Sequence, residues 1–397
     1  MKTWKQGAVT LACDQLREHI AGKKIALMMN TSAIDNEGRL LLDVIVKEQW
    51  AEVAFFFGME HGVRGNLYAS NGDKTDVDET TGVKIISLYN YEGNRPPVEE
   101  IVKVDAVVFC AQDVGVRHWT YTPWMCTLIE ACAKAGRECI VLDRPNPIRG
   151  DIVEGAPNEK YVGLSLLSGF DYPLRHGMTI GELALMYNEE QHIGCNLTVL
   201  KMKGWRRDMW YDETGLVWLP PSPNMPTLDT PLYFAATGLM QTSNIALGYG
   251  TTTPFQYVGR PEFSGEALAE ELNSRGLEGV YFVPKYYMTS TLSLDGKNSG
   301  MALCNGVMMV IHDRNLWRPV LTQLHIMDAI VKLYPDLLDL DRKRCGDSRR
   351  TRYAHIRMGT DRICQLAEAG ESLAPVMEAW EKGAEEFKRR REKYLLY

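Results

Sequence analysis

The sequence lacks several features that would each assign the chain to a familiar class. It has no apolar run of 18 residues, so no transmembrane helix is predicted. The net charge is −7, which argues against nucleic acid or an anionic membrane surface as the main partner. The first residues contain no apolar core of the kind that signal peptides carry. We therefore expect a cytoplasmic protein, or a secreted or periplasmic one if a leader has been removed.

Common catalytic motifs are also missing. No strand leads into Gly-x-Gly-x-x-Gly and there is no Walker loop, which argues against nicotinamide, flavin and nucleotide chemistry. Residues 163–167 do not match the nucleophile elbow of serine hydrolases, and no His-Glu-x-x-His is present. The nine cysteines contain no Cys-x-x-Cys pair, which excludes a zinc ribbon and indicates reduced thiols. We expect no cofactor and no resident metal; a metal-dependent hydrolase using His61, Asp113 and His176 is a minor alternative.

What is present is an ordinary globular composition arranged in alternating strands and helices. The chain has 397 residues, 45% hydrophobic and 24% charged, which suits two domains. The expected strands are residues 24–29, 53–57, 84–88, 104–110, 138–142, 197–202, 279–283 and 307–311. The expected helices are residues 40–50, 122–135, 179–190, 264–275 and 360–393. This alternation predicts an α/β fold with a parallel sheet covered on both faces, and we place the domains at residues 1–170 and 171–397.

Polar residues follow several of the expected strands. Glu60 and His61 follow the second strand, Gln112 and Asp113 the fourth, and Asp143 the fifth. Parallel strands end at one edge of the sheet, where ligands bind, so these groups should converge. Carboxylates and arginines without a nucleotide motif favour hydrolysis by acid/base chemistry, as in glycoside hydrolysis. The competing interpretation is a set of solvated loops.

Eight segments together resemble the exo-β-N-acetylmuramidases of glycoside hydrolase family 171. The segments are residues 60–65 (EHGVRG), 112–117 (QDVGVR), 120–122 (TYT), 143–147 (DRPNP), 176–182 (HGMTIGE), 221–225 (PSPNM), 252–255 (TTPF) and 393–397 (KYLLY). They follow the family's order and span nearly the whole chain. The resemblance implies a Rossmann-like domain, a smaller α/β domain and an active cleft between them. It also implies release of terminal N-acetylmuramic acid from peptidoglycan fragments, with the family's catalytic glutamate at Glu60.

The resemblance and the strand ends together define the candidate site. The catalytic candidates are Glu60, Asp113 and Asp143, and the substrate-binding candidates are His61, Arg64, Gln112, Arg117, Arg144, Asn146, His176, Glu182 and Asn224. The lactyl carboxylate of N-acetylmuramic acid would meet Arg64, Arg117 or Arg144 in a bidentate contact. The second catalytic group stays open among Asp113, Asp143, Glu182 and the substrate's own acetamido oxygen. Glu182 also suits a purely structural capping box with Thr179.

The sequence departs from the family in one loop. Gln241-Thr242-Ser243-Asn244 stands where the family carries Glu-Gly-Thr-Asn, and residues 245–251 lack a further acid and an arginine. Met59 stands where proline is usual. The alternative function is therefore a non-catalytic or altered-specificity sugar-binding paralogue. The expected partner in either case is a small carbohydrate, a muropeptide or a MurNAc-GlcNAc fragment, with the oligomeric state undetermined.

Overall fold

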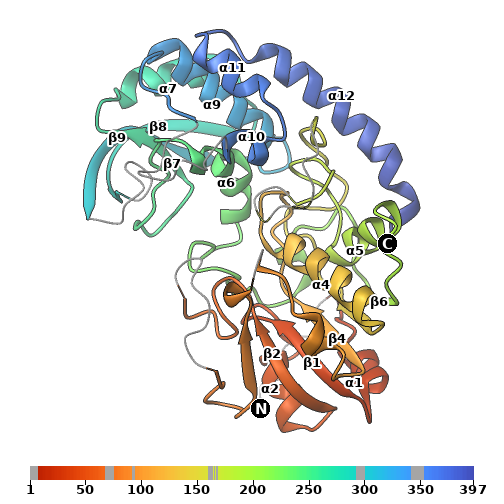
Figure 1. Ribbon diagram of the computed structural model, residues 1–397. Coiled ribbons are helices and arrows are strands. Elements are labelled where there is room, and N and C mark those ends of the chain that lie inside the picture. The colour runs from red at the N-terminus through yellow and green to blue at the C-terminus, as the bar shows by residue number, and fades with distance from the viewer. Residues whose placement is uncertain are drawn as a thin grey trace.

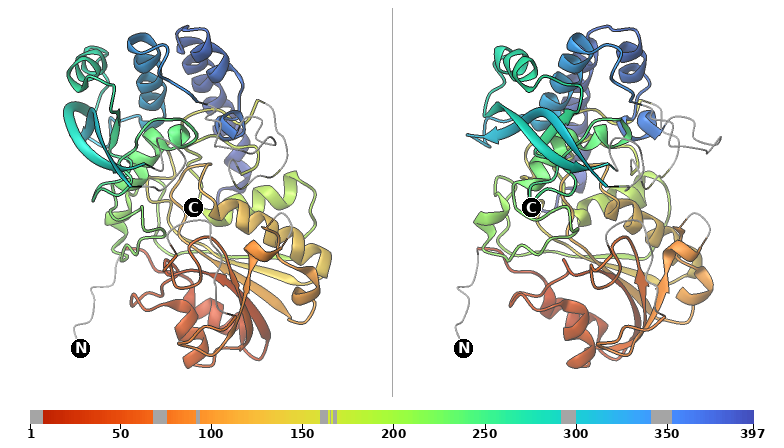
Figure 2. Two further views of the ribbon diagram at one scale, coloured as in Figure 1. Left: turned by 60° about the vertical axis from the view of Figure 1, so that its left-hand side comes forward. Right: turned by 90° about the vertical axis from the view of Figure 1, so that its left-hand side faces the viewer.

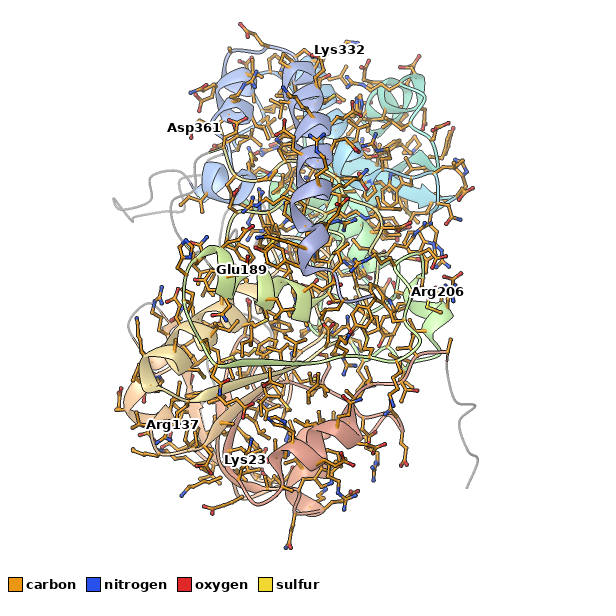
Figure 3. All side chains as sticks on the ribbon, turned by 90° about the vertical axis from the view of Figure 1, so that its right-hand side faces the viewer. Lys23, Arg137, Glu189, Arg206, Lys332 and Asp361 are labelled. Atoms are coloured by element: carbon orange, nitrogen blue, oxygen red, sulfur yellow. The ribbon has the colours of Figure 1, made fainter. Side chains whose placement is uncertain are left out.

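The computed structural model describes residues 8–67, 76–91, 94–159, 164, 166, 169–291, 300–340 and 353–397. The segment 163–167, considered above as a nucleophile elbow, therefore lies largely outside the described residues. Figure 1 shows two units, one built on a sheet at the red and orange end of the chain and one on a smaller sheet in teal. Figure 3 places Lys23 and Arg137 at the end formed by the first unit and Lys332 at the opposite end.

The first unit is built on a six-stranded sheet. Its strands are β1 (Lys24–Met29), β2 (Glu52–Gly58), β3 (Lys84–Ser87), β4 (Ala106–Cys110), β5 (Glu138–Leu142) and β6 (Leu197–Leu200). The order is β3-β2-β1-β4-β5-β6 and every neighbouring pair is parallel. This is the strand order of a doubly wound Rossmann-type sheet. The α/β fold class and the parallel sheet are confirmed.

Helices cover both faces of this sheet. The helices of the first unit are α1 (Cys13–Ile20), α2 (Leu41–Lys47), α3 (Val98–Ile101), α4 (Tyr121–Ala135) and α5 (Ile180–Glu190). Successive residues of a strand point to opposite faces, and Phe56 accordingly packs in one core cluster while Phe55 and Phe57 pack in the other. Helix α4 ends at Gly136 in a left-handed conformation, as predicted. The capping box of Thr179 and Glu182 is present at the start of α5.

The second unit holds a three-stranded antiparallel sheet. Its strands are β7 (Tyr257–Arg260), β8 (Val280–Ser290) and β9 (Met301–Ile311), in the order β7-β9-β8. The helices that follow the first sheet are α6 (Thr230–Thr237), α7 (Gly265–Ser274), α9 (Pro319–Leu333), α10 (Tyr353–Met358), α11 (Arg362–Glu368) and α12 (Ala374–Arg391). Short 3-10 turns occur at η1 (Leu88–Asn90), η3 (Tyr211–Thr214), η4 (Gly238–Thr242) and η5 (Glu392–Tyr394).

The C-terminal helical region is interrupted, whereas the sequence pattern predicted one helix over residues 360–393. Helices α11 and α12 are separated by residues 369–373. The cause is Gly370, which adopts a φ of 67° and so ends α11 in the left-handed conformation that terminates helices. Helix α12 then runs along one side of the molecule back to α5 (Figures 1 and 2), where Arg390 pairs with Asp171 and Glu190.

The pairing of strands in the first sheet shows how far along the chain the first unit extends. Strand β6 pairs with β5, so the first sheet continues past residue 170 to residue 200. We therefore propose a boundary near residue 230 in place of the one between residues 170 and 171, because α6 is the first helix that packs against α9 of the second unit. None of the helices in the described ranges is long and apolar enough to span a bilayer.

Candidate active site

Glu60 lies in the turn that follows β2. His61 and Gly62 both adopt left-handed backbone conformations there, with φ of 70° and 72°, so the chain reverses immediately after the strand. The Glu60 side chain is half-buried, and its Oε2 accepts a hydrogen bond from the hydroxyl of Thr120. The Glu60 carboxylate therefore lies beside the start of α4, and it remains partly open to solvent.

Two tyrosines lie within electrostatic reach of Glu60. Burial is the main cause that raises the pKa of both Tyr89 and Tyr121 above the usual value, and the negative charge of Glu60 adds to it. The Tyr121 hydroxyl accepts a hydrogen bond from Asn30 and donates one to the carbonyl of Pro221. Both phenols thus stay neutral beside the Glu60 carboxylate.

Asp113 follows β4 but is enclosed. It is 3% exposed, and its Oδ2 accepts a hydrogen bond of 2.6 Å from the amide of Gly115. The Nε2 atom of His176 lies 3.2 Å from the same oxygen. Because Nδ1 of His176 accepts a hydrogen bond from the Met178 amide, the ring proton is on Nε2, which makes no hydrogen bond among the described residues. Asp113 and His176 form a buried pair that joins two loops.

Asp143 follows β5 and is fully buried. Its two oxygens accept four hydrogen bonds, from the amides of Arg144 and Gly181 and the hydroxyls of Thr179 and Tyr397. Burial and the neighbouring charge of Glu182 nevertheless raise the pKa of Asp143 to about 7. All of these donors belong to the protein, which leaves no face of this carboxyl open to a sugar.

Glu182 serves the α5 capping box and the C-terminal segment. Its Oε2 accepts from the amide of Thr179, and its Oε1 accepts from the guanidinium of Arg207 and the amide of Leu396. The residue is fully buried. The capping box that the sequence suggested accounts for the contact with Thr179, and Arg207 and Leu396 add contacts that the sequence did not predict.

The three arginines proposed to clamp a carboxylate are engaged within the protein. Arg64 donates to both oxygens of Asp78 and to Asp43. Arg144 is 2% exposed and donates to Gln112 and to the carbonyl of Ile34. Among the described residues, none of the three donates a hydrogen bond to Glu60, and their guanidinium groups are already bound to other groups of the protein.

Arg117 is the most completely enclosed of these arginines. Its guanidinium donates to four backbone carbonyls, those of Ala156, Tyr172, Arg357 and Met358. Burial lowers its pKa to about 10. Arg357 and Met358 belong to α10, so Arg117 fastens the loop before α4 to a helix of the second unit.

The remaining polar candidates brace the loops at the strand ends. The Gln112 side-chain amide donates to the carbonyls of Asp113 and Pro145, and Asn146 donates to Met178. His61 Nδ1 donates to the carbonyl of Leu67 at 2.8 Å. Asn224 is half-buried, and its backbone amide donates to the hydroxyl of Ser222. Of all the candidates, Glu60, Arg64 and Asn224 are those with more than marginal exposure.

Among the candidate carboxyl groups, Glu60 is therefore partly exposed, whereas Asp113, Asp143 and Glu182 are buried and bound to other groups of the protein. Sequence reasoning missed Thr120, Tyr121 and Tyr89 as the neighbours of Glu60. Residues 120–122 were among the segments that carried the family resemblance, so a signal for Thr120 and Tyr121 existed. Tyr89 follows β3, a strand whose end the strand-end argument did not use.

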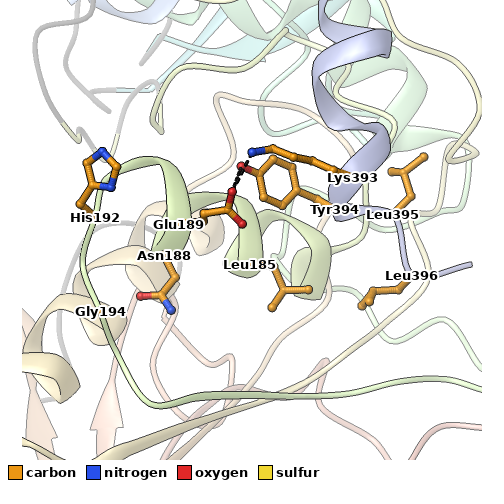
Figure 4. Close-up of a pocket in the computed structure, with 9 residues that line it drawn as sticks. All are labelled: Leu185, Asn188, Glu189, His192, Gly194, Lys393, Tyr394, Leu395 and Leu396. Carbon is orange, nitrogen blue, oxygen red and sulfur yellow. Dashed lines mark hydrogen bonds and ion pairs between the residues drawn. The ribbon is translucent and has the colours of Figure 1, made fainter.

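Two further features of the structure bear on other possibilities. A hollow of about 610 Å³ lies between α5 and the C-terminal segment, where Lys393 pairs with Glu189 (Figure 4). None of the predicted site residues lines this hollow, although Leu396 in its lining donates to Glu182. Within the described ranges, no three His, Cys, Asp or Glu side chains lie close enough to hold a metal ion. The metal-hydrolase alternative thus has no ligand set among these residues.

The fold is that of a two-domain α/β protein, with the half-buried carboxyl of Glu60 at the end of β2. A model of the N-terminal part of exo-β-N-acetylmuramidase NamZ matches residues 25–229, and a model of its C-terminal part matches residues 232–397. The chain belongs to the exo-β-N-acetylmuramidase family.

Individual relatives cover the whole chain. The peptidoglycan β-N-acetylmuramidase NamZ of Bacillus subtilis (strain 168) is 36% identical over 404 residues, covering 100% of this chain and 93% of that protein. Two crystal structures of DUF1343 family proteins from Bacteroides fragilis NCTC 9343 are similar, with TM-scores of 0.86 and 0.75. They are 33% and 29% identical to this chain, and each comparison covers 98% of this chain and 99% of the other.

Proposed function

We propose that this chain is an exo-acting glycoside hydrolase that releases terminal N-acetylmuramic acid from peptidoglycan fragments, with Glu60 as general acid. The family membership and the full-length relative named peptidoglycan β-N-acetylmuramidase support the reaction. The observation that carries the role of Glu60 is exposure. Glu60 is half-buried, whereas Asp113, Asp143 and Glu182 are 3%, 0% and 0% exposed.

The chemistry assigned to Glu60 follows from its two oxygens. Oε2 accepts the Thr120 hydroxyl, while Oε1 has no hydrogen-bond partner among the described residues. A protonated carboxyl held by one oxygen can present the other to the glycosidic oxygen and donate its proton as the bond breaks. The same carboxylate can afterwards take a proton from the attacking water.

We assign the second role to the substrate's acetamido oxygen. The three other candidate carboxyls are enclosed, and their oxygens already accept hydrogen bonds from the protein. Glycosidases in which the substrate supplies this group need no second protein carboxylate as nucleophile. A substrate analogue that carries a hydroxyl in place of the 2-acetamido group is therefore expected to bind without turnover.

The non-catalytic paralogue is less well supported. The altered loop engages its own unit: Gln241 contacts the hydroxyl of Tyr249 and receives a hydrogen bond from Arg357. Among the described residues, the hydrogen bond to the Glu60 carboxylate comes from Thr120. We retain a MurNAc-GlcNAc fragment or a muropeptide as the substrate and the cytoplasm as the location, where such an enzyme would act on recycled wall fragments. The buried free thiols are compatible with that location.

The proposed function is tested by following products from two end-defined disaccharides. MurNAc-GlcNAc carries the expected sugar at its non-reducing end, and GlcNAc-MurNAc is the matched control with the order reversed. We expect free N-acetylmuramic acid from the first and no cleavage of the second, with release of 4-nitrophenol from the 4-nitrophenyl N-acetylmuramic acid glycoside. Binding of these sugars without any product would favour the sugar-binding paralogue instead.

A further inference from the structure

Thr120 occupies the N-cap position of α4 but does not cap the helix. A threonine at this position usually accepts a hydrogen bond from an amide of the first turn, which stabilises the helix. No side-chain cap bond is present at the start of α4. The Thr120 hydroxyl instead donates to Oε2 of Glu60, which lies 60 residues earlier in the chain. Thr120, at a position where threonine usually caps a helix, thus binds the Glu60 carboxylate instead.

The backbone on both sides of Thr120 is anchored. Tyr121 is fully buried and is hydrogen-bonded to Asn30 and to the carbonyl of Pro221. The ring of Trp119 packs edge-on against Tyr121, with 5.0 Å between the ring centroids. The Thr120 carbonyl also accepts the Trp124 amide at 3.1 Å. These contacts fix where the hydroxyl points, so a hydrogen bond to it fixes one oxygen of Glu60.

The Thr120 hydroxyl acts on the position of the carboxylate. Its hydrogen bond holds Oε2 of Glu60 in one place. Removing the hydroxyl therefore allows the Glu60 side chain to change rotamer. This effect acts on Glu60 and does not require that Thr120 touch the sugar.

We infer that Thr120 is a positioning residue for the reaction, which holds Glu60 so that Oε1 faces the glycosidic oxygen. This inference rests on the proposed function of Glu60. It assigns to the hydroxyl, and not to the methyl group of Thr120, the contribution to catalysis. Serine should therefore replace threonine with little loss, whereas valine, which has nearly the same shape, should not.

The test compares Thr120→Val and Thr120→Ser with the unmutated chain on the 4-nitrophenyl glycoside. A misplaced catalytic group costs about 100-fold in rate, so we expect kcat of T120V to fall by about 10- to 100-fold with KM changed by less than about 3-fold. In T120S kcat should return to near the unmutated value, because serine keeps the hydroxyl.

Stability measurements and a second variant keep the test decisive. Thr120→Ala also lacks the hydroxyl, so whichever of T120V and T120A unfolds cooperatively near the unmutated Tm supplies the comparison. Unchanged kcat in that variant, with E60Q inactive, would overturn the positioning role and leave the proposed function intact. An E60Q variant as active as the unmutated chain would instead remove the proposed role of Glu60, and with it the role of Thr120.

Discussion

The hydroxyl of Tyr397 donates a 2.7 Å hydrogen bond to Oδ2 of Asp143, although the two residues lie 254 positions apart. The same hydroxyl accepts the Met202 amide at 2.9 Å. The C-terminal segment, whose sequence contributed to the family resemblance, therefore completes the hydrogen bonding at the end of β5. It does so for a carboxyl group that is fully buried.

Replacing Tyr397 by Phe should lower the stability of the fold. The change leaves Asp143 with one donor fewer and the Met202 amide without its acceptor, and an unsatisfied buried group costs about 1–3 kcal/mol. Urea denaturation should show this loss. Tyr394→Phe is the control, because the Tyr394 hydroxyl contacts Glu189, an exposed side chain, at 3.3 Å; equal stability of the two variants would contradict the account of Asp143.

His118 makes the stability depend on pH. Burial, followed by the charges of Arg357 and Arg117, holds the pKa of His118 well below its usual value. The folded chain therefore keeps the ring neutral, while the unfolded chain binds a proton below a pH of about 6.5. Because the unfolded state binds more protons there, stability contributed by this residue is present above that pH and is lost as pH falls, by up to about 1.4 kcal/mol per pH unit.

A substitution isolates the His118 contribution. His118→Gln should unfold with a free energy that changes less between pH 6.5 and 5 than that of the unmutated chain, measured by urea titration at each pH. His192, which is exposed, is the matched site, and His192→Gln should keep the original slope. If H118Q kept that slope as well, the neutral buried state of His118 would be wrong.

Arg117 should affect stability more than substrate binding. A lysine ammonium cannot reach four carbonyls that a planar guanidinium spans, and hydrogen bonds from a charged group contribute about 1.5–3 kcal/mol each when buried. Arg117→Lys should thus lower Tm clearly while leaving KM for the glycoside within about 3-fold, since a residue that does not touch substrate alters no binding contact. Arg206→Lys is the control, because Arg206 is an exposed partner of Asp208. A large rise in KM at unchanged Tm would restore Arg117 as a substrate clamp.

The sequence predicted the sheet well because strand and helix periods are local. The strands at residues 24–29 and 138–142 match β1 and β5 in full, and Gly136 ends α4 as expected. The periodicity of a strand does not show which other strand lies beside it in the sheet. Strand β6 was expected at residues 197–202, yet its place beside β5 follows from the pairing of Ile140 with Thr198, which no local pattern predicts.

The same limit explains the mixed outcome for the site. The strand-end argument predicted that Glu60, Asp113 and Asp143 lie at one edge, but burial separates them. Asp143 is enclosed by Thr179 and Tyr397, from 36 and 254 residues away, and such distant partners leave no signal in the residues around Asp143. Glu60 is half-buried, in a turn that continues through the left-handed residues His61 and Gly62, and its carboxylate accepts a hydrogen bond from Thr120 at the start of α4.

The most direct test of the account is the rate of Glu60→Gln on the 4-nitrophenyl glycoside of N-acetylmuramic acid, with product binding measured by calorimetry. Loss of general acid catalysis lowers rates by about 100- to 10,000-fold, so we expect a fall of that size in kcat with the Kd for N-acetylmuramic acid nearly unchanged. Glu52→Gln, at the exposed opposite end of the same strand, should retain full activity. An E60Q enzyme within a few-fold of the E52Q rate would contradict the assignment of Glu60 as the catalytic acid.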